Sequence, residues 1–129
     1  MTPKWVPIAA VIVIHDRQIA RHGGAPGIRD RGLIETGLAR PINRHGFSES
    51  DLFVLAANYA FGISKAHAFV DGNKRTAIVT AVTFLALNGI GFSAPPNEVV
   101  RYMEDLAASV VSEDEFAEWL RRRRTKGGP

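Results

Sequence analysis

Apolar residues dominate two long segments in the middle of the chain, residues 48–64 and residues 73–87. If each segment is a helix, its apolar residues cover most of the helix circumference, which is typical of a helix that is buried on nearly every side. Further helices are predicted over residues 5–20, 30–39, 96–108 and 112–120. Strand-like alternation is almost absent, so the pattern predicts an all-α fold in which the other helices surround a central buried pair.

Capping residues define several of these helix ends. Ser48 is a predicted N-cap, and Ser112 with Glu115 three positions later is typical of a capping box. Pro96 suits the first turn of a helix, while Gly89 suits the left-handed residue that follows a helix end. These signals predict short connections between the helices.

Two segments are predicted to be irregular. The helix over residues 30–39 is expected to end before Pro41, and residues 42–47 are expected to form an irregular or β-hairpin flap. Residues 23–30 contain three glycines and a proline, which predicts a turn-rich loop. This loop either only connects two helices or also contacts a protein target.

Composition is that of one ordinary globular domain. The chain has 129 residues, of which 46% are apolar and 22% charged. It has no cysteine, which excludes disulfides and thiolate chemistry and agrees with an expected cytoplasmic location. No apolar run approaches the length of a membrane span, and residues 6–14 are expected to begin a core-facing helix rather than a signal peptide.

The positive charge is concentrated at the C-terminal end. The formal net charge is +3, but residues 121–129 carry five cations, which leaves −2 on residues 1–120. A nucleic-acid-binding module usually carries its positive charge on a folded face, so nucleic acid is not an expected partner. We therefore divide the chain into a main domain, residues 1–120, and a basic tail, residues 121–129, which we expect to be a solvated, frayed helix end.

The segment between the two buried helices is unusually polar for its place. Residues 67–77 read H-A-F-V-D-G-N-K-R-T-A. Gly72 allows the backbone to approach a ligand closely. Asn73, Lys74 and Arg75 then fall in the first helical turn, where backbone N–H groups have no partner within the helix and cations oppose the helix dipole. This arrangement predicts a phosphate-binding site.

Two further groups in this segment suit catalysis. Asp71 is a ligand of the kind that Mg²⁺ uses together with phosphate oxygens, and His67 is the nearby group suited to act as a general base. Simpler roles exist for each: Asp71 as a helix N-cap, His67 as a structural histidine, Lys74 as a solvated side chain, and Arg75 as the partner of a surface carboxylate. The remaining histidines are scattered and are interpreted as structural or surface residues: His15, His22 and His45.

This segment resembles the motif of the Fic/Doc family. Fic adenylyltransferases usually read H-P-F-x-[DE]-G-N-G-R, whereas the Doc branch has lysine at the position of the second glycine, as Lys74 does here. Residues 14–30, I-H-D-R-Q-I-A-R-H-G-G-A-P-G-I-R-D, also resemble the N-terminal region of Doc-like proteins. The resemblance extends over about residues 8–120 and implies a compact helical bundle of the Fic/Doc type.

The resemblance implies a role for each matching residue. His67 matches the residue that deprotonates the target hydroxyl, and Asp71 matches the Mg²⁺ ligand. The nucleotide or its phosphates would be bound by Gly72, Asn73, Lys74, Arg75 and Lys65. The implied reaction moves the γ-phosphate of ATP to a Ser or Thr hydroxyl of a translation protein, with elongation factor Tu as the expected target. Gly72 matches Fic proteins and only some Doc-like proteins, so adenylyl transfer at the same site remains the alternative.

The family resemblance also implies a regulatory partner. Many Fic proteins contain an inhibitory helix with the pattern [ST]-x-x-x-E-[GN]. Residues 109–114 match it only in part, because Asp114 occupies the final position. The expected inhibitor is therefore a separate Phd-like antitoxin, whose disordered tail folds onto the toxin through a groove near Arg75.

Overall fold

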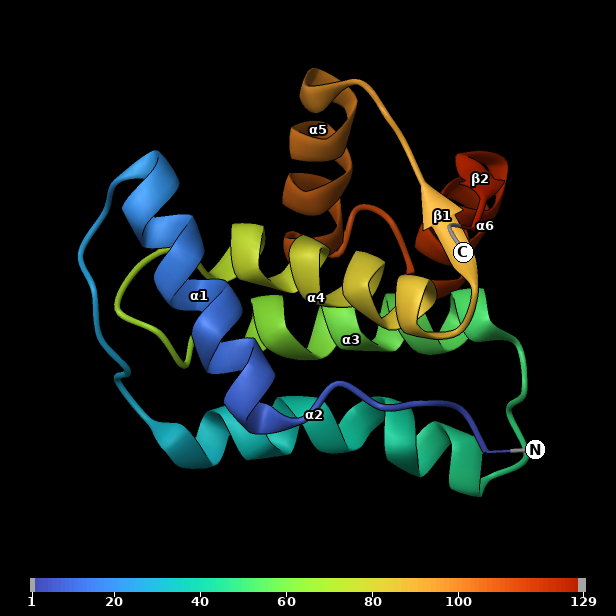
Figure 1. The fold of residues 1–129 in the computed structure, drawn as a ribbon, viewed down its shortest axis with the longest axis horizontal. Coiled ribbons are helices and arrows are strands. Elements are labelled where there is room, and N and C mark those ends of the chain that lie inside the picture. The colour runs from blue at the N-terminus through green and yellow to red at the C-terminus, as the bar shows by residue number, and fades with distance from the viewer. Residues whose placement is uncertain (1, 128–129) are drawn as a thin grey trace.

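The computed structural model describes residues 2–127, and within them the chain forms six helices and two short strands. The helices are α1 (Ile8–His22), α2 (Arg31–Gly46), α3 (Leu52–Ala66), α4 (Asn73–Leu87), α5 (Pro96–Ala107) and α6 (Glu113–Arg122). The strands are β1 (Ile90–Phe92) and β2 (Arg124–Lys126) (Figure 1). The prediction of an all-α fold is confirmed. No helix within the described range is long and apolar enough to cross a bilayer.

Helices α3 and α4 are the central pair. They pack against each other, with α2 and α6 also on α3 and with α1 on α4 (Figure 1). Large side chains of both helices, such as Leu55, Tyr59 and Phe84, are almost completely buried. Their apolar residues surround the helix because each helix has neighbours on several sides, which is what the sequence pattern predicted.

Several predicted helix ends are confirmed. Helix α4 runs from Asn73 to Leu87 and is followed by Gly89 at φ +86°. Helix α5 begins at Pro96, and Ser112 caps α6 with the reciprocal Glu115 bond of a capping box. Local sequence is sufficient to place these ends, because the backbone preferences of glycine and proline and the cap bonds of Ser112 and Glu115 act within one helix and its flanking residues.

Helix α2 differs from its prediction, because it continues through Pro41 to Gly46. A proline inside a helix costs about 3 kcal/mol, since it removes a hydrogen bond and crowds the carbonyl one turn earlier. Here the ring of Pro41 is buried on the same face as Ile34 and Leu38, and this packing against the core outweighs that cost. The flap predicted at residues 42–47 is therefore wrong: this segment is the last turn of α2 and its C-cap.

Helix α3 begins later than predicted. Its N-cap is Asp51, whose Oδ1 accepts hydrogen bonds from the N–H groups of Phe53 at 2.8 Å and Val54 at 3.4 Å. Ser48 instead adopts a left-handed conformation, with φ +76°, in the connection from α2. The other oxygen of Asp51 accepts a 2.5 Å hydrogen bond from Arg121, so a residue 70 positions away helps to select this cap.

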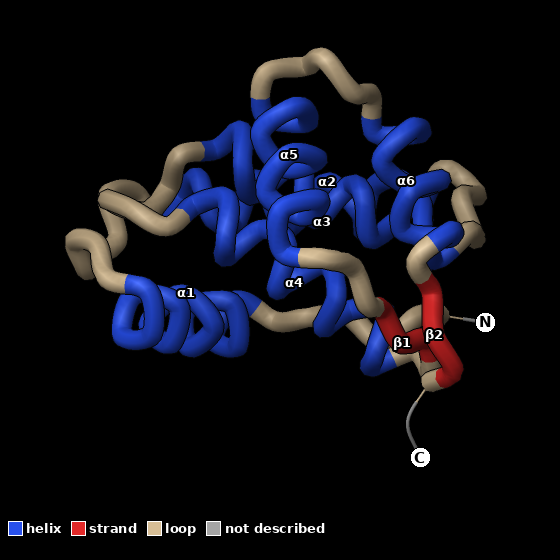
Figure 2. The backbone as a smooth tube through the Cα atoms, turned by 90° about the horizontal axis from the view of Figure 1, so that it is seen from above, coloured by secondary structure: helices blue, strands red, loops and turns tan. Residues whose placement is uncertain are grey.

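The basic tail is folded onto the domain as far as the structure describes it. Helix α6 extends to Arg122, and β2 pairs with β1 in antiparallel register, Ile90 opposite Lys126. The turned view in Figure 2 shows the two strands side by side next to α6. The expectation of a frayed end is wrong for residues 121–126, while residues 128 and 129 of the predicted tail lie outside the described residues.

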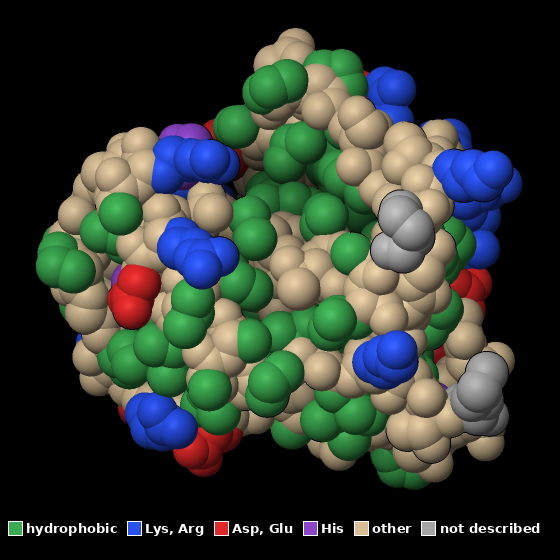
Figure 3. All heavy atoms as spheres, in the orientation of Figure 1, with side chains coloured by type: hydrophobic (Ala, Val, Ile, Leu, Met, Phe, Trp, Pro, Cys, Tyr) green, Lys and Arg blue, Asp and Glu red, His purple; other side chains and the backbone are tan. Residues whose placement is uncertain are grey.

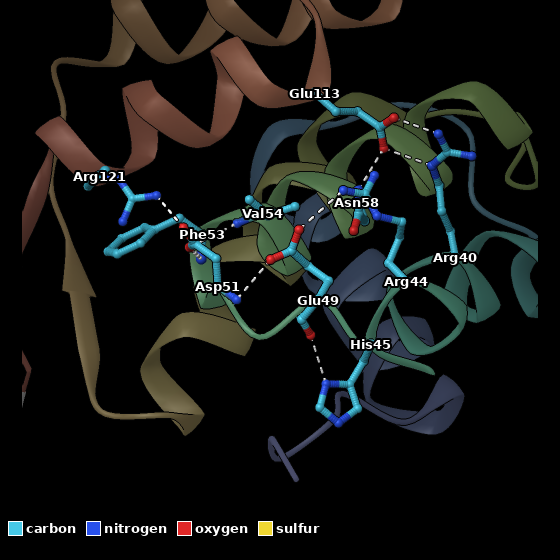
Figure 4. Close-up of polar contacts among 10 residues, drawn as sticks. All are labelled: Arg40, Arg44, His45, Glu49, Asp51, Phe53, Val54, Asn58, Glu113 and Arg121. Atoms are coloured by element: carbon cyan, nitrogen blue, oxygen red, sulfur yellow. Dashed lines mark hydrogen bonds and ion pairs between the residues drawn. The ribbon is translucent and has the colours of Figure 1, made fainter. Parts of the chain in front are cut away.

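Ion pairs join α6 to the α2–α3 layer (Figure 4). Glu113 accepts two hydrogen bonds from Arg40, at 2.7 and 2.5 Å, and a third from Asn58 at 2.9 Å. Burial raises the pKa of Glu113, but the bonds from Arg40 and Asn58 outweigh it, so the pKa lies below its ordinary value. Three helices therefore meet at one ionised carboxylate.

Helices α2 and α3 approach each other closely where Gly37 of α2 meets Gly62 of α3. A methyl group at Gly62 would lie 2.5 Å from the Gly37 carbonyl oxygen. We expect Gly62→Ala to destabilise the fold by about 1–3 kcal/mol in urea unfolding, because backbone must move to accommodate the methyl group. The matched control is Gly46→Ala at the end of α2, where nothing lies within 4 Å. Equal stability of the two variants would contradict the close crossing.

Glu98 in the first turn of α5 provides a test of the α5–α6 contact. Its carboxylate accepts hydrogen bonds from Arg123 and from the indole N–H of Trp119, which lower its pKa from 4.5 to about 2. Because the folded-state pKa is lowered, the stabilisation is complete above pH 4.5 and is lost as the pH falls toward 2. Glu98→Gln should therefore be less stable than the parent at pH 7, and the difference should shrink across that range.

Unfolding curves at several pH values check this expectation. Glu104→Gln, on an exposed position of the same helix, is the control and should show no such pH-dependent difference. A Glu98→Gln deficit that stayed constant down to acidic pH would mean that the carboxylate charge is not what holds α5 to α6.

Candidate active site

The loop between α3 and α4 is a tight turn with two left-handed residues. His67, the C-cap of α3, has φ +49°, and Gly72, the N-cap of α4, has φ +74°. Between them Phe69 is buried and anchors the loop to the core. His67 itself is exposed, so the turn buries its apolar residue and presents the histidine to solvent.

The side chain of Asn73 closes this loop. Its Oδ1 accepts a hydrogen bond from the Phe69 N–H, and its Nδ2 donates one to the Phe69 carbonyl, both at 3.0 Å. Both polar atoms of the side chain are thus occupied by one backbone residue. Asn73 therefore holds the loop through its side chain, and it also contributes the first N–H of α4.

The α1–α2 loop, residues 23–30, lies along the α3–α4 loop. Ile28 and Phe69 form an antiparallel bridge, and the Val70 N–H donates to the Gly27 carbonyl at 3.1 Å. The Arg29 guanidinium donates a 2.5 Å hydrogen bond to the His67 carbonyl. Residues 23–30 are therefore more than a connection, because they hold the backbone on which His67 sits. Sequence reasoning did not find Arg29, which has no motif signal of its own.

A cavity of about 540 Å³ opens at the N-terminus of α4. Its polar wall contains most of the predicted site residues: His67, Asp71, Gly72, Asn73, Lys74 and Arg75. Its apolar wall comes from α4 and α5 and includes Ile78, Val99, Val100 and Met103. The fold thus brings together in one cavity residues that suit phosphate binding and residues that suit a flat or apolar group.

The cations at the start of α4 are exposed to this cavity. Arg75 donates a long 3.5 Å hydrogen bond to the Gly23 carbonyl. Lys74 and Arg75 lie in the first turn, beside N–H groups that lack partners within the helix. Two cations, free N–H groups and the positive end of a helix dipole together favour an anion at this position.

Asp71 is held in the ionised form at the edge of the cavity. Its Oδ1 accepts a hydrogen bond from the Gly72 N–H at 2.9 Å, and its Oδ2 accepts one from the Ala25 N–H at 3.3 Å. These two hydrogen bonds lower the pKa of Asp71, and the positive charge of Arg75 lowers it further by a smaller amount. The N-cap of α4 is Gly72, with no side-chain cap bond, so capping does not explain this carboxylate.

The single carboxylate of Asp71 suits a metal ion that binds together with phosphate. Within residues 2–127 no group of three His, Asp or Glu side chains could hold a metal ion. Mg²⁺ commonly takes one or two carboxylates and completes its octahedron with phosphate oxygens and water. One oriented carboxylate next to an anion-binding helix terminus therefore fits Mg²⁺ bound together with a nucleotide.

Lys65 is not brought into this cavity. Its Nζ donates a 2.9 Å hydrogen bond to Ser109 Oγ and lies 5.7 Å from the centre of the Phe61 ring. Lys65 is thus directed toward the α5–α6 connection. His15, interpreted from the sequence as structural or surface, is buried directly under the loop, with Nε2 2.7 Å from the Asp71 carbonyl oxygen. Its spacing of four residues from the buried Val11 on α1 was the signal for that burial.

Fold and site together define an all-α domain with a cationic helix N-terminus next to an exposed histidine. The family model for the Fic/DOC family matches residues 5–85. The chain therefore belongs to the Fic/Doc family. The match spans α1 to α4 and so includes all six of the predicted site residues that line the cavity.

Two curated relatives are Doc toxins. The chain is 36% identical over 113 residues to "Protein kinase doc" of Escherichia phage P1, covering 87% of this chain and 89% of that protein. It is 38% identical over 94 residues to "Toxin Doc" of Mycolicibacterium smegmatis, covering 71% of each. Within the family, these similarities identify the chain as a member of the Doc toxin group.

The role of the Asn73 side chain in closing the α3–α4 loop can be tested by substitution. Asn73→Ala leaves the N–H and carbonyl of Phe69 without their partners, and each unsatisfied buried group costs about 1–3 kcal/mol. We expect lower stability in urea unfolding and faster hydrogen exchange at the Phe69 amide. Asn97→Ala, at an exposed first-turn position of α5, is the control. An unchanged rate of hydrogen exchange at the Phe69 amide in Asn73→Ala would show that the Asn73 side chain does not hold the loop.

Proposed function

We propose that this protein is the toxin of a toxin–antitoxin system and transfers the γ-phosphate of ATP to a Ser or Thr hydroxyl of a translation protein, with elongation factor Tu as the expected target. One observation carries the proposal: a single cavity is lined by His67, by Asp71 and by the cationic first turn of α4. The similarity to a protein named "Protein kinase doc" supports the same class of reaction. A translation target would place its action in the cytoplasm.

Each residue has a distinct part in this mechanism. The N–H groups at the start of α4, with Lys74 and Arg75, bind the phosphates and balance their charge. Asp71 would hold Mg²⁺, which when bound neutralises charge on the phosphate oxygens. His67 accepts the proton of the target hydroxyl as its oxygen bonds to the γ-phosphorus and the bond to ADP breaks. Little further covalent chemistry is required, because phosphoryl transfer depends mainly on positioning and charge.

The alternative reaction at this site is adenylyl transfer. Lys74 stands where Fic adenylyltransferases have a glycine, which favours γ-phosphoryl transfer, while Gly72 agrees with both reactions. Nucleic-acid binding through the tail has less support. Two of the tail arginines, Arg121 and Arg123, are already paired with Asp51 and Glu98, which reduces the charge that the tail could offer to a polyanion.

The reaction is tested with γ-³²P-ATP and α-³²P-ATP in parallel, in a translation extract with added Mg²⁺. We expect the γ label alone to reach a protein of the extract, because only the terminal phosphoryl group is transferred. His67→Ala should lower the rate by about 10²–10⁴-fold through loss of the general base. Label from the α position would instead identify nucleotidyl transfer.

The matched control for His67→Ala is His22→Ala. His22 is also an exposed histidine that lines the cavity, but it lies at the end of α1. We expect this variant to retain the parent rate. If His67→Ala folds and transfers phosphate as fast as the parent, His67 is not the general base.

The antitoxin partner is proposed to bind near Arg75, and the name "Toxin Doc" of one relative supports the existence of a paired inhibitor. Apolar side chains gather in the hollow framed by α1, α4 and α5 (Figure 3). In the cavity next to Arg75 they include Ile78, Val99 and Met103, and Val100 is 54% exposed. An amphipathic helix with an acidic side chain opposite Arg75 would cover this wall and obstruct the phosphate site.

Growth of an expressing cell tests the toxin assignment. Expression of the chain alone should arrest growth, because an essential translation protein is modified. Co-expression with an antitoxin encoded beside it should restore growth, and His67→Ala should not arrest growth at all. Normal growth with the folded parent protein, and no difference from His67→Ala, would contradict the toxin assignment.

A further inference from the structure

His15 is a buried polar residue that the proposed mechanism does not use. It lies on α1, is 1% exposed, and its ring stacks on Phe69 with centroids 3.9 Å apart and planes 10° apart. Its Nε2 is 2.7 Å from the carbonyl oxygen of Asp71. A carbonyl can only accept a hydrogen bond, so Nε2 must carry the proton and donate it.

The acceptor of this bond belongs to the peptide group that joins Asp71 to Gly72. The N–H of the same peptide group donates to Asp71 Oδ1 at 2.9 Å. The peptide is therefore held at both ends: His15 holds its oxygen, and the Asp71 carboxylate holds its N–H. Rotation of this peptide would break both bonds together and free the Oδ1 atom of the carboxylate.

Gly72 is the reason that the Asp71–Gly72 peptide group needs these hydrogen bonds. Glycine adopts left-handed and right-handed backbone conformations with similar ease, so the residue itself does not select one orientation of the preceding peptide. In the structure Gly72 has φ +74° and is followed directly by α4. An external donor must therefore set the peptide orientation, and His15 supplies it from another helix.

The segment that follows α1 holds the other oxygen of Asp71. The Ala25 N–H donates to Oδ2 at 3.3 Å, and a methyl group at Gly24 would lie 2.7 Å from that oxygen. Residues 15–25 thus contact Asp71 at its carbonyl and at its carboxylate. Helix α1 and its loop therefore determine the position of this side chain.

We propose that His15 is a positioning residue that fixes the Asp71–Gly72 peptide and thereby directs the Asp71 carboxylate toward the Mg²⁺-nucleotide. The consequence for nucleotide binding rests on the proposed function, whereas the consequence for the peptide does not. Residues that orient a metal ligand through a hydrogen bond typically change metal affinity 10- to 100-fold when they are removed.

The first test uses the parent protein without substitution or nucleotide. Nitrogen-15 NMR of the imidazole distinguishes the two neutral tautomers of His15. We expect the Nε2–H form, with a slowly exchanging proton, in the folded protein. An Nδ1–H tautomer would overturn the proposal, because Nε2 could then not donate to Asp71.

The second test compares three variants at two buried positions of α1. His15→Leu removes the donor, His15→Gln keeps an N–H donor at the corresponding position, and Val11→Ala perturbs the core one turn earlier without altering the bond. The NMR signal of the Gly72 amide reports the peptide, and calorimetry with Mg²⁺-ATP reports binding. We expect His15→Leu to shift the Gly72 signal and weaken binding by about 10- to 100-fold.

His15→Gln should return the Gly72 amide signal close to its parent position and restore most of the affinity for Mg²⁺-ATP. Val11→Ala should leave both the signal and the affinity unchanged even though it lowers stability. Equal effects of His15→Leu and Val11→Ala, or no rescue by His15→Gln, would reduce His15 to a core residue and overturn the proposal. If the parent does not bind Mg²⁺-ATP, the proposed function fails, and the Gly72 signal and the tautomer still decide the role of His15.

Discussion

The two hydrogen bonds between the Asn73 side chain and the Phe69 backbone are the interaction on which the site depends. They close the turn between two buried helices, so that Phe69 enters the core while His67 remains exposed. A turn held only by its apolar residue could rotate, because packing is not directional. Hydrogen bonds to a single backbone residue give the turn its orientation and fix where α4 begins.

The rest of the architecture supports this turn from outside. Helix α1 covers α4, and the loop after it pairs with the α3–α4 loop through the Ile28–Phe69 bridge. Arg29 holds the carbonyl of His67, and His15 holds the carbonyl of Asp71. The reactive side chains thus lie on a loop whose backbone groups are bound by a neighbouring segment, an arrangement that preorganises a site.

Charge is distributed so that the site keeps its cations free. Several arginines of α2 and of the C-terminal segment are paired with carboxylates at helix junctions, for example Arg40 with Glu113 and Arg123 with Glu98. These pairs hold α5 and α6 against the core, and α5 supplies the apolar wall of the cavity. Lys74 and Arg75 at the start of α4 are left available to an anion.

The sequence by itself determined the helical class, the buried pair, both ends of α4 and the start of α6, because hydrophobic period and caps are local properties of the chain. It also identified the candidate site residues, all of which except Lys65 line the cavity. Only the tertiary structure decided that α2 passes through Pro41, that Asp51 rather than Ser48 caps α3, and that the tail pairs with β1. In each case a partner distant in sequence supplies the energy that overrides a local preference. The role of His15 is also decided by tertiary structure, because its hydrogen bond to Asp71 forms only when α1 packs beneath the α3–α4 loop.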